Sequence, residues 1–241
     1  KDTWPIARGF DRYYGLINGA SNFFQPDPTK HLTLDATLVE PKGDDYYTTD
    51  YFTHYALSFL DQHAREHADQ PFFLYLAYTS PHWPLQAWPE DVAKYRGKYK
   101  VGWDRLREQR LARQREMGLI RPEWKLTERD PDVPAWDTLD AKKQDELDHI
   151  MSLFAAMVDR MDQNIARLVG HLRDYGWLDN TLILFLADNG GCAEGGNLGK
   201  YTPENLGTKE GYGPPMYGAC WANASNTPFR RYKHWTHEGG M

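Results

Sequence analysis

The stretch LILFLADNGG, residues 182–191, decides how the rest of the chain is interpreted. Five large apolar side chains and an alanine are followed by an acid, an amide and two glycines. The run TLILFLA (181–187) is short and continuous, which is typical of a strand buried on both faces. Its polar end has two explanations. Asp-Asn-Gly-Gly is a common surface turn, and it is also a pair of oxygen ligands for a metal at the carboxyl end of a buried strand.

The segments around this run extend it to an α/β pattern. PFFLYLAY (71–78) is a second short apolar run and predicts a second buried strand. Apolar residues recur at steps of three and four across 49–66, and again from about 141 to 175, so both stretches predict helices with one buried face. Strands that alternate with helices predict a sheet covered on both faces. The glycine-rich stretch 190–218 is expected to form an ordered loop over a site.

Composition narrows the classes of partner. The length of 241 residues suits one large domain or two small ones. The net charge of -6 gives no indication of a basic face for nucleic acid. No apolar stretch reaches the roughly 20 residues needed to cross a bilayer. We therefore expect neither nucleic acid nor a membrane as a partner. The charged, proline-containing stretch 95–139 predicts a surface excursion that carries one helix, not a second core.

Polar residues follow both predicted strands. His82 lies between two prolines just after 71–78, and Asp188 and Asn189 follow 181–187. Ligands of open α/β sheets gather at the carboxyl ends of strands, where a hard cation such as calcium would take carboxylate and amide oxygens. Flanking prolines would fix the backbone that aims an imidazole for proton transfer or anion binding. Taken singly, each motif also fits a plainer structural role, a turn or an exposed histidine.

The carboxyl-terminal motif adds a lysine to this set. NTPFRRYKHWTHEGGM (226–241) places Lys233 five residues before a Glu-Gly-Gly at 238–240. With SPHWP and ADNGG in this order, and with the opening ARGFDRYYGLINGASNFF (7–24), the chain resembles the type I sulfatases of the alkaline-phosphatase superfamily, above all bacterial arylsulfatases. The resemblance implies an alkaline-phosphatase-like α/β fold, with a mixed sheet covered by helices on both faces and incomplete in this chain. It also implies hydrolysis of sulfate monoesters.

The resemblance implies a role for four residues. Asp188 and Asn189 match the ligands of the family's metal ion, calcium in preference to magnesium. His82 matches the histidine that contacts the sulfate ester and protonates the leaving oxygen. Lys233 matches the lysine that holds a sulfate oxygen. These groups suit the chemistry, because cleavage of an anionic sulfate ester places negative charge on the bridging oxygen. The expected partner is a small-molecule aryl or sugar sulfate.

The family's nucleophile has no counterpart in this sequence. It is a formylglycine made from the first residue of a Cys/Ser-x-Pro/Ala-x-Arg motif, and Ser80, Cys192 and Cys220 do not begin such a motif. We therefore expect residues 1–241 to be the central part of the catalytic domain, holding half of the site and inactive by themselves. The nucleophile-bearing part would lie upstream and a small domain downstream. The parent protein would need a formylglycine-generating enzyme, and its compartment stays open between bacterial periplasm and cytoplasm.

Two other classes of function remain open at this point. A phosphatase or phosphodiesterase of the same superfamily would share the sheet, although its zinc enzymes call for a richer set of Asp and His ligands. A non-catalytic carbohydrate-binding module would explain the nine tryptophans and the missing nucleophile. The order of the motifs argues against a binding module, which has no need of a metal pair, a histidine and a lysine on separate elements.

The two cysteines, Cys192 and Cys220, are either paired or free.

Overall fold

The computed structural model describes residues 1–210 and 213–240, which form two compact units. The long helix α4, Ala141–Asp174, contributes residues to both units. The first unit contains Lys1–Ala87, Met157–Ile183 and a short segment that begins at Lys209. The second contains Trp88–Ala156, Leu184–Thr208 and a segment that begins at Gly213. Each unit is described by itself below.

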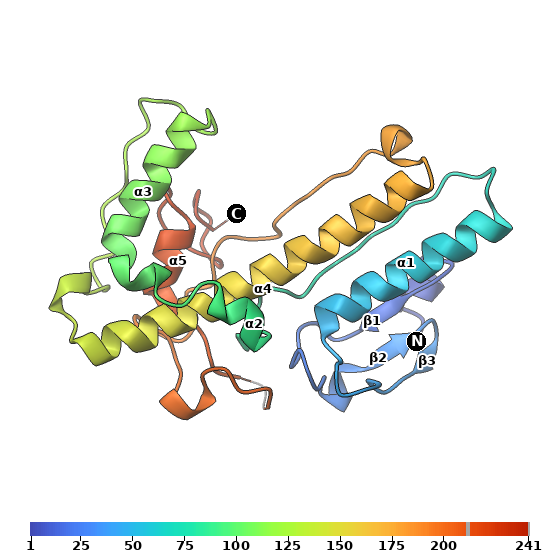
Figure 1. The fold of residues 1–241 in the computed structure, drawn as a ribbon, viewed down its shortest axis with the longest axis horizontal. Coiled ribbons are helices and arrows are strands. Elements are labelled where there is room, and N and C mark those ends of the chain that lie inside the picture. Colours follow the sequence, from blue (N-terminus) through green and yellow to red (C-terminus); the bar gives the residue numbers. More distant parts are fainter. Residues whose placement is uncertain (211–212, 241) are drawn as a thin grey trace. The chain divides into compact units, whose positions relative to one another are not determined.

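The first unit is built on a small antiparallel sheet and one long helix (Figure 1). The strands are β1 (Tyr14–Leu16), β2 (Leu32–Leu34) and β3 (Thr37–Leu38), in that order across the sheet. Helix α1, Thr48–Glu66, confirms the helix predicted at 49–66. The ring of Tyr14 joins the two elements, because it stacks on Tyr55 at 3.8 Å and meets Phe52 edge-on at 6.1 Å. The apolar stripe of α1 thus covers the sheet.

The second half of α4 lies along α1, and Asp50 is the main polar contact between them. Its carboxylate accepts hydrogen bonds from the Arg160 guanidinium at 2.7 and 2.8 Å and from the Asn164 amide at 2.7 Å. Toward the other end of the two helices, the Tyr175 hydroxyl donates to Asp61 at 2.9 Å. The helix predicted from about 141 to 175 is confirmed. Arg160 and Asn164 of α4 thus help to fix its register against α1.

Three tryptophans lie together in the core of the second unit. Trp103 and Trp221 are fully buried and Trp136 nearly so, with the Trp103 ring 4.8 Å from Trp136 and 5.4 Å from Trp221. The Trp221 Nε1–H donates to the Leu147 carbonyl of α4 at 3.0 Å. The predicted surface excursion, 95–139, contributes a helix and also two of these tryptophans. The high average charge of this stretch gives no indication of these buried tryptophans.

The helices of the second unit are α2 (Pro89–Ala93), α3 (Gly102–Glu116), α5 (Gly218–Ser225) and part of α4.

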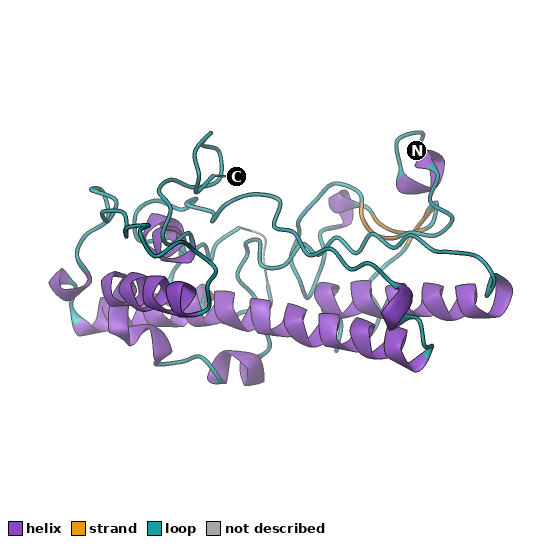
Figure 2. Ribbon diagram, turned by 90° about the horizontal axis from the view of Figure 1, so that it is seen from above, coloured by secondary structure: helices purple, strands orange, loops and turns teal. Residues whose placement is uncertain are grey.

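The two buried strands predicted at 71–78 and 181–187 are wrong. Both segments are loop in Figure 2, and large side chains on them are exposed, including Phe73 at 80% and Leu182 at 84%. A buried strand needs partners for its backbone N–H and C=O groups as well as apolar side chains. Among the residues that the structure describes, neither segment pairs with a neighbouring strand. The two segments thus have the apolar pattern of buried strands, but in the described residues they lack the hydrogen bonds to a neighbouring strand.

The glycine-rich loop between 190 and 218 is ordered where the structure describes it. Lys200 and Met216 exchange backbone hydrogen bonds of 3.0 Å, and the carbonyls of Gly196 and Asn197 accept from the first amides of α5. These carbonyls satisfy N–H groups that a helix start leaves unpaired. The predicted loop is thus held by its own contacts in the described residues, whereas residues 211 and 212 lie outside the described ranges. That the loop covers a site stays a prediction. None of the described helices combines the length and apolar character required to span a membrane.

In residues 1–210 and 213–240, the other regular elements are short 3-10 helices. They are Pro5–Arg8, Pro28–Lys30, Lys98–Val101, Trp136–Thr138, Leu178–Asn180 and Pro203–Asn205.

His149 of α4 makes the stability of the second unit depend on pH. Burial lowers the pKa of His149 from its usual 6.5, and the positive charge of Arg96 lowers it further. The unfolded chain therefore takes up this proton at a higher pH than the folded chain does. The free energy of unfolding should be intact above about pH 6.5 and should fall as the pH drops toward the folded pKa. We expect His149→Gln to lose less stability than the wild type in urea unfolding between pH 7.5 and 5.5; parallel losses would contradict this assignment.

Candidate active site

The loop that follows Asp188 and Asn189 packs backbone to backbone against the Glu-Gly-Gly segment. The Gly190 amide donates to the Gly240 carbonyl at 3.4 Å. A Cβ atom on Gly190 would overlap the carbonyl oxygen of Gly239. Gly190 does not have a positive φ, so closeness and not backbone conformation requires glycine there. The bare backbone after the acid and the amide therefore permits contact with a segment about 50 positions further along the chain.

One carboxamide joins three parts of this region. Asn226 Oδ1 accepts from the Gly191 amide at 2.9 Å. Its Nδ2 donates to the carbonyls of Arg231 at 2.9 Å and Gly239 at 2.7 Å. Sequence reasoning did not single out Asn226, because an asparagine in NTPF belongs to no ligand or catalytic pattern. Its importance follows from contacts between segments that are distant in sequence.

Lys233 lies beside the loop of the predicted metal ligands. Its backbone amide donates to the Gly191 carbonyl at 3.1 Å. Its Nζ lies 3.4 Å from Glu194 Oε1, and 21% of its side chain is exposed. Gly191 follows Asp188 by three residues and Asn189 by two. The structure therefore places three of the four sequence-predicted site residues in one region of the second unit.

The predicted metal ligands have the right chemistry for calcium. Asp188 is exposed and Asn189 half-buried, and both follow directly on the exposed apolar run. Carboxylate and amide oxygens are ligands that calcium accepts, and calcium takes about six to eight oxygens in all. Among the described residues, no three or more His, Cys, Asp or Glu side chains gather in a metal-binding group. The pair thus fits calcium as part of a larger set of ligands.

His82 lies in the first unit, on a loop with fixed hydrogen bonds. Its ring is half-buried, and Nδ1–H donates to the Trp83 carbonyl at 2.6 Å. Its backbone amide donates to Thr79, and the hydroxyl of Ser80 donates to the Met157 carbonyl at 3.1 Å. Because Nδ1 is engaged, Nε2 is the ring nitrogen left for a substrate.

The two cysteines are both free. Cys192 is half-buried, and Cys220 is buried. Burial raises the pKa of each thiol, and the negative charge of Glu194 adds to the rise at Cys192. Both are therefore thiols at neutral pH, whereas a nucleophilic cysteine acts as a thiolate.

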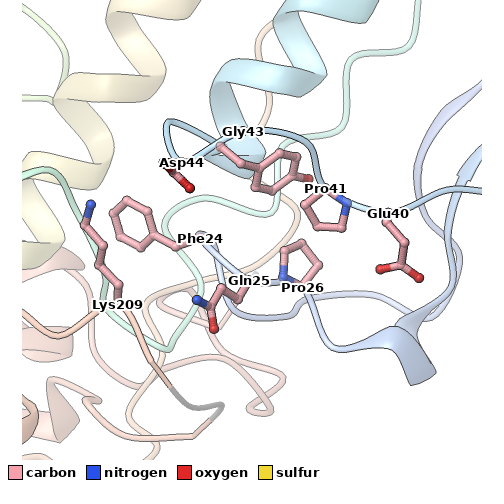
Figure 3. Close-up of a pocket in the computed structure, with 9 residues that line it drawn as sticks. Phe24, Gln25, Pro26, Glu40, Pro41, Gly43, Asp44 and Lys209 are labelled. Atoms are coloured by element: carbon pink, nitrogen blue, oxygen red, sulfur yellow. The ribbon is translucent and has the colours of Figure 1, made fainter.

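A cavity of about 370 Å³ lies in the first unit (Figure 3). Phe24 and Tyr46 form part of its wall, with Glu40 and Asp44 as charged groups. Lys209 also lines it, with Nζ 4.8 Å from the Phe24 ring. The cavity thus combines an apolar wall with charges of both signs. None of the four predicted site residues is among those that line it.

Comparison with known proteins identifies relatives that match this chain over nearly all of its residues. The sequence model of the sulfatase family matches residues 1–239. An uncharacterized sulfatase of Schizosaccharomyces pombe is 34% identical over 268 residues, covering 100% of this chain and 47% of that protein. An arylsulfatase of Klebsiella aerogenes is 31% identical over 256 residues, covering 98% of this chain and 54% of the relative. This chain therefore spans about half the length of these curated relatives.

Solved structures agree with the sequence comparison. The crystal structure of Ps i-CgsB in complex with k-i-k-neocarrahexaose is 26% identical, with a TM-score of 0.58, and covers 99% of this chain and 39% of that chain. This similarity confirms the predicted fold class, an alkaline-phosphatase-like α/β fold that is present here in part. With its motifs, its fold and its match across residues 1–239, the chain belongs to the sulfatase family.

Proposed function

We propose that the protein containing this chain is a sulfuric ester hydrolase of the arylsulfatase type, which cleaves sulfate monoesters. The observation that carries the proposal is the hydrogen bond from Lys233 to Gly191, which sets an ammonium-bearing residue beside the loop of Asp188 and Asn189. Cleavage of a sulfate ester requires positive charge near the sulfate oxygens, which Lys233 would provide together with a cation held by Asp188 and Asn189. Membership of the sulfatase family and the arylsulfatase relative support the same activity.

Each of the four residues has a distinct task in this proposal. Asp188 and Asn189 would hold calcium through their oxygen atoms, and the bound ion would stabilise negative charge on the sulfate oxygens. Lys233 donates a hydrogen bond to a sulfate oxygen. His82 carries a proton at Nε2 and transfers it to the bridging oxygen as the S–O bond breaks, so that the alcohol or phenol leaves neutral. The hydrogen bond from Nδ1 to the Trp83 carbonyl orients the ring.

The rest of the site belongs, in this proposal, to parts of the protein outside this chain. The chain spans about half the length of its curated relatives and provides two ligands for an ion that takes more. The nucleophile is a formylglycine elsewhere in the protein, made by a formylglycine-generating enzyme. Residues 1–241 alone would therefore not hydrolyse sulfate esters. The substrate is a small aryl or sugar sulfate. The neighbour in complex with neocarrahexaose supports including sulfated saccharides among the candidates.

The test uses the full-length protein, expressed with a formylglycine-generating enzyme, and measures hydrolysis of p-nitrophenyl sulfate and sulfated oligosaccharides with calcium or a chelator. Lys233→Ala, Asp188→Ala and His82→Ala should each lower kcat/KM by at least about 100-fold, because each removes a group that acts on the transition state. Lys142→Ala and Asp179→Ala, at exposed positions, are matched controls that should behave as the wild type.

Two results would contradict the proposal. One is hydrolysis of p-nitrophenyl phosphate without hydrolysis of any sulfate ester, which would favour the phosphatase branch of the superfamily. The other is wild-type sulfatase activity in the Lys233 and Asp188 variants, which would remove these residues from the site. Loss of sulfate-ester hydrolysis on chelation, restored by calcium, would support the metal assignment.

A further inference from the structure

Glu194 contacts two consecutive residues of the lysine segment. Its Oε1 lies 3.4 Å from Lys233 Nζ and 3.1 Å from His234 Nε2. The Glu194 side chain is 33% exposed and the Lys233 side chain 21%, whereas His234 is 68% exposed. The carboxylate and the ammonium are thus partly shielded from water, where their attraction exceeds that of a fully exposed pair.

The backbone next to Lys233 is held in an unusual conformation. His234 has a φ of 80°, in the left-handed region that residues other than glycine rarely adopt. Such a conformation persists only where surrounding contacts maintain it, and it is found more often at functional sites than elsewhere. Two contacts maintain it here. The Lys233 amide is hydrogen-bonded to Gly191, and the His234 ring lies against Glu194.

We infer that Glu194 is a positioning residue for Lys233, a role that rests on the proposed function of this site. Lysine has a flexible stem with several rotatable bonds, so an unheld ammonium would occupy many positions. The carboxylate takes one of its three N–H groups and leaves the other two for a sulfate oxygen. Glu194 acts through Lys233 and does not itself touch the substrate.

This role predicts that loss of Glu194 lowers kcat without raising KM. Without Glu194 the ammonium is less well aligned for the transition state, so kcat should fall about 10-fold in Glu194→Ala. The site also loses a negative charge, so the anionic substrate should bind as well as before or better, and KM should stay constant or fall. Glu194→Gln keeps an acceptor oxygen and should recover part of kcat. A residue needed only for folding would not produce this split.

The experiment measures both constants for the full-length, formylglycine-containing protein on a sulfate ester that the wild type hydrolyses. The matched control is Glu204→Gln, an exposed glutamate of the same glycine-rich loop, which should leave both constants unchanged. In a Lys233→Ala background, Glu194→Ala should cause no further loss, because the residue through which it acts is gone. Thermal unfolding identifies any variant that fails to fold. If Glu194→Ala fails to fold, the kcat and KM of Glu194→Gln test the positioning role instead.

The outcomes separate this inference from the proposed function. Wild-type kcat in both Glu194 variants would overturn the inference while leaving the function intact. The same fold-loss with and without Lys233 would also overturn it, because Glu194 would then act independently. Wild-type activity in Lys233→Ala alone would instead refute the proposed function, and the positioning role with it.

Discussion

Gly190→Ala is expected to disrupt the candidate active site more than any other single methyl group added to this loop. The new Cβ would overlap the carbonyl oxygen of Gly239, which is backbone and cannot move aside by changing a rotamer. We expect the free energy of unfolding to fall by about 3 kcal/mol, at the upper end for an overpacked site. If the proposed function holds, displacement of the loop should also lower sulfate-ester hydrolysis by at least about 100-fold, because it moves the proposed site residues Asp188, Asn189 and Lys233.

Urea unfolding and hydrolysis kinetics of the full-length protein test this expectation. Gly170→Ala is the matched control, since a Cβ there would meet nothing within 4 Å. Gly170 lies inside α4, so alanine should be neutral or stabilising by up to about 1 kcal/mol. If Gly190→Ala proved as stable and active as the control, the two glycine segments would not be in contact as described.

Asn226→Asp is expected to be the second most damaging substitution, although it changes a single atom. Aspartate can still accept from the Gly191 amide, but it has no hydrogen to donate. Its second carboxylate oxygen would face the carbonyl oxygens of Arg231 and Gly239. We expect a loss of about 3 kcal/mol in unfolding free energy, because two acceptors lose their donor and a charge is added against them. Asn226→Ala, which adds no charge, should cost less.

Thermal and urea unfolding of the full-length protein provide the comparison. The exposed Asn180, changed to aspartate, controls for the added negative charge and should lose no more than a few tenths of a kcal/mol. Equal stability of Asn226→Asp and Asn226→Ala would show that the two carbonyl contacts do not depend on the amide. A smaller loss for aspartate than for alanine would contradict the arrangement itself.

The helices were predictable because their signal is local. The apolar spacing in 49–66 and 141–175 depends on residues three and four positions apart, and α1 and α4 occur where that spacing predicts them. The apolar runs at 71–78 and 181–187 carry no comparable information about pairing, since a strand is completed by another strand. A similar limit applied to Trp103 and Trp136, whose charged surroundings concealed their burial in the second unit.

The sequence by itself determined the family, the helices and the residue types of the candidate site: a carboxylate and an amide after an apolar run, a histidine between prolines, and a lysine before Glu-Gly-Gly. Only the tertiary structure showed that position 190 requires glycine, because the backbone of Gly239 lies against it. It also revealed Asn226 and Glu194, which belong to no motif. The physical reason is that a motif records the chemistry a residue offers. Contacts between backbone segments about 50 residues apart exist only once the chain has folded.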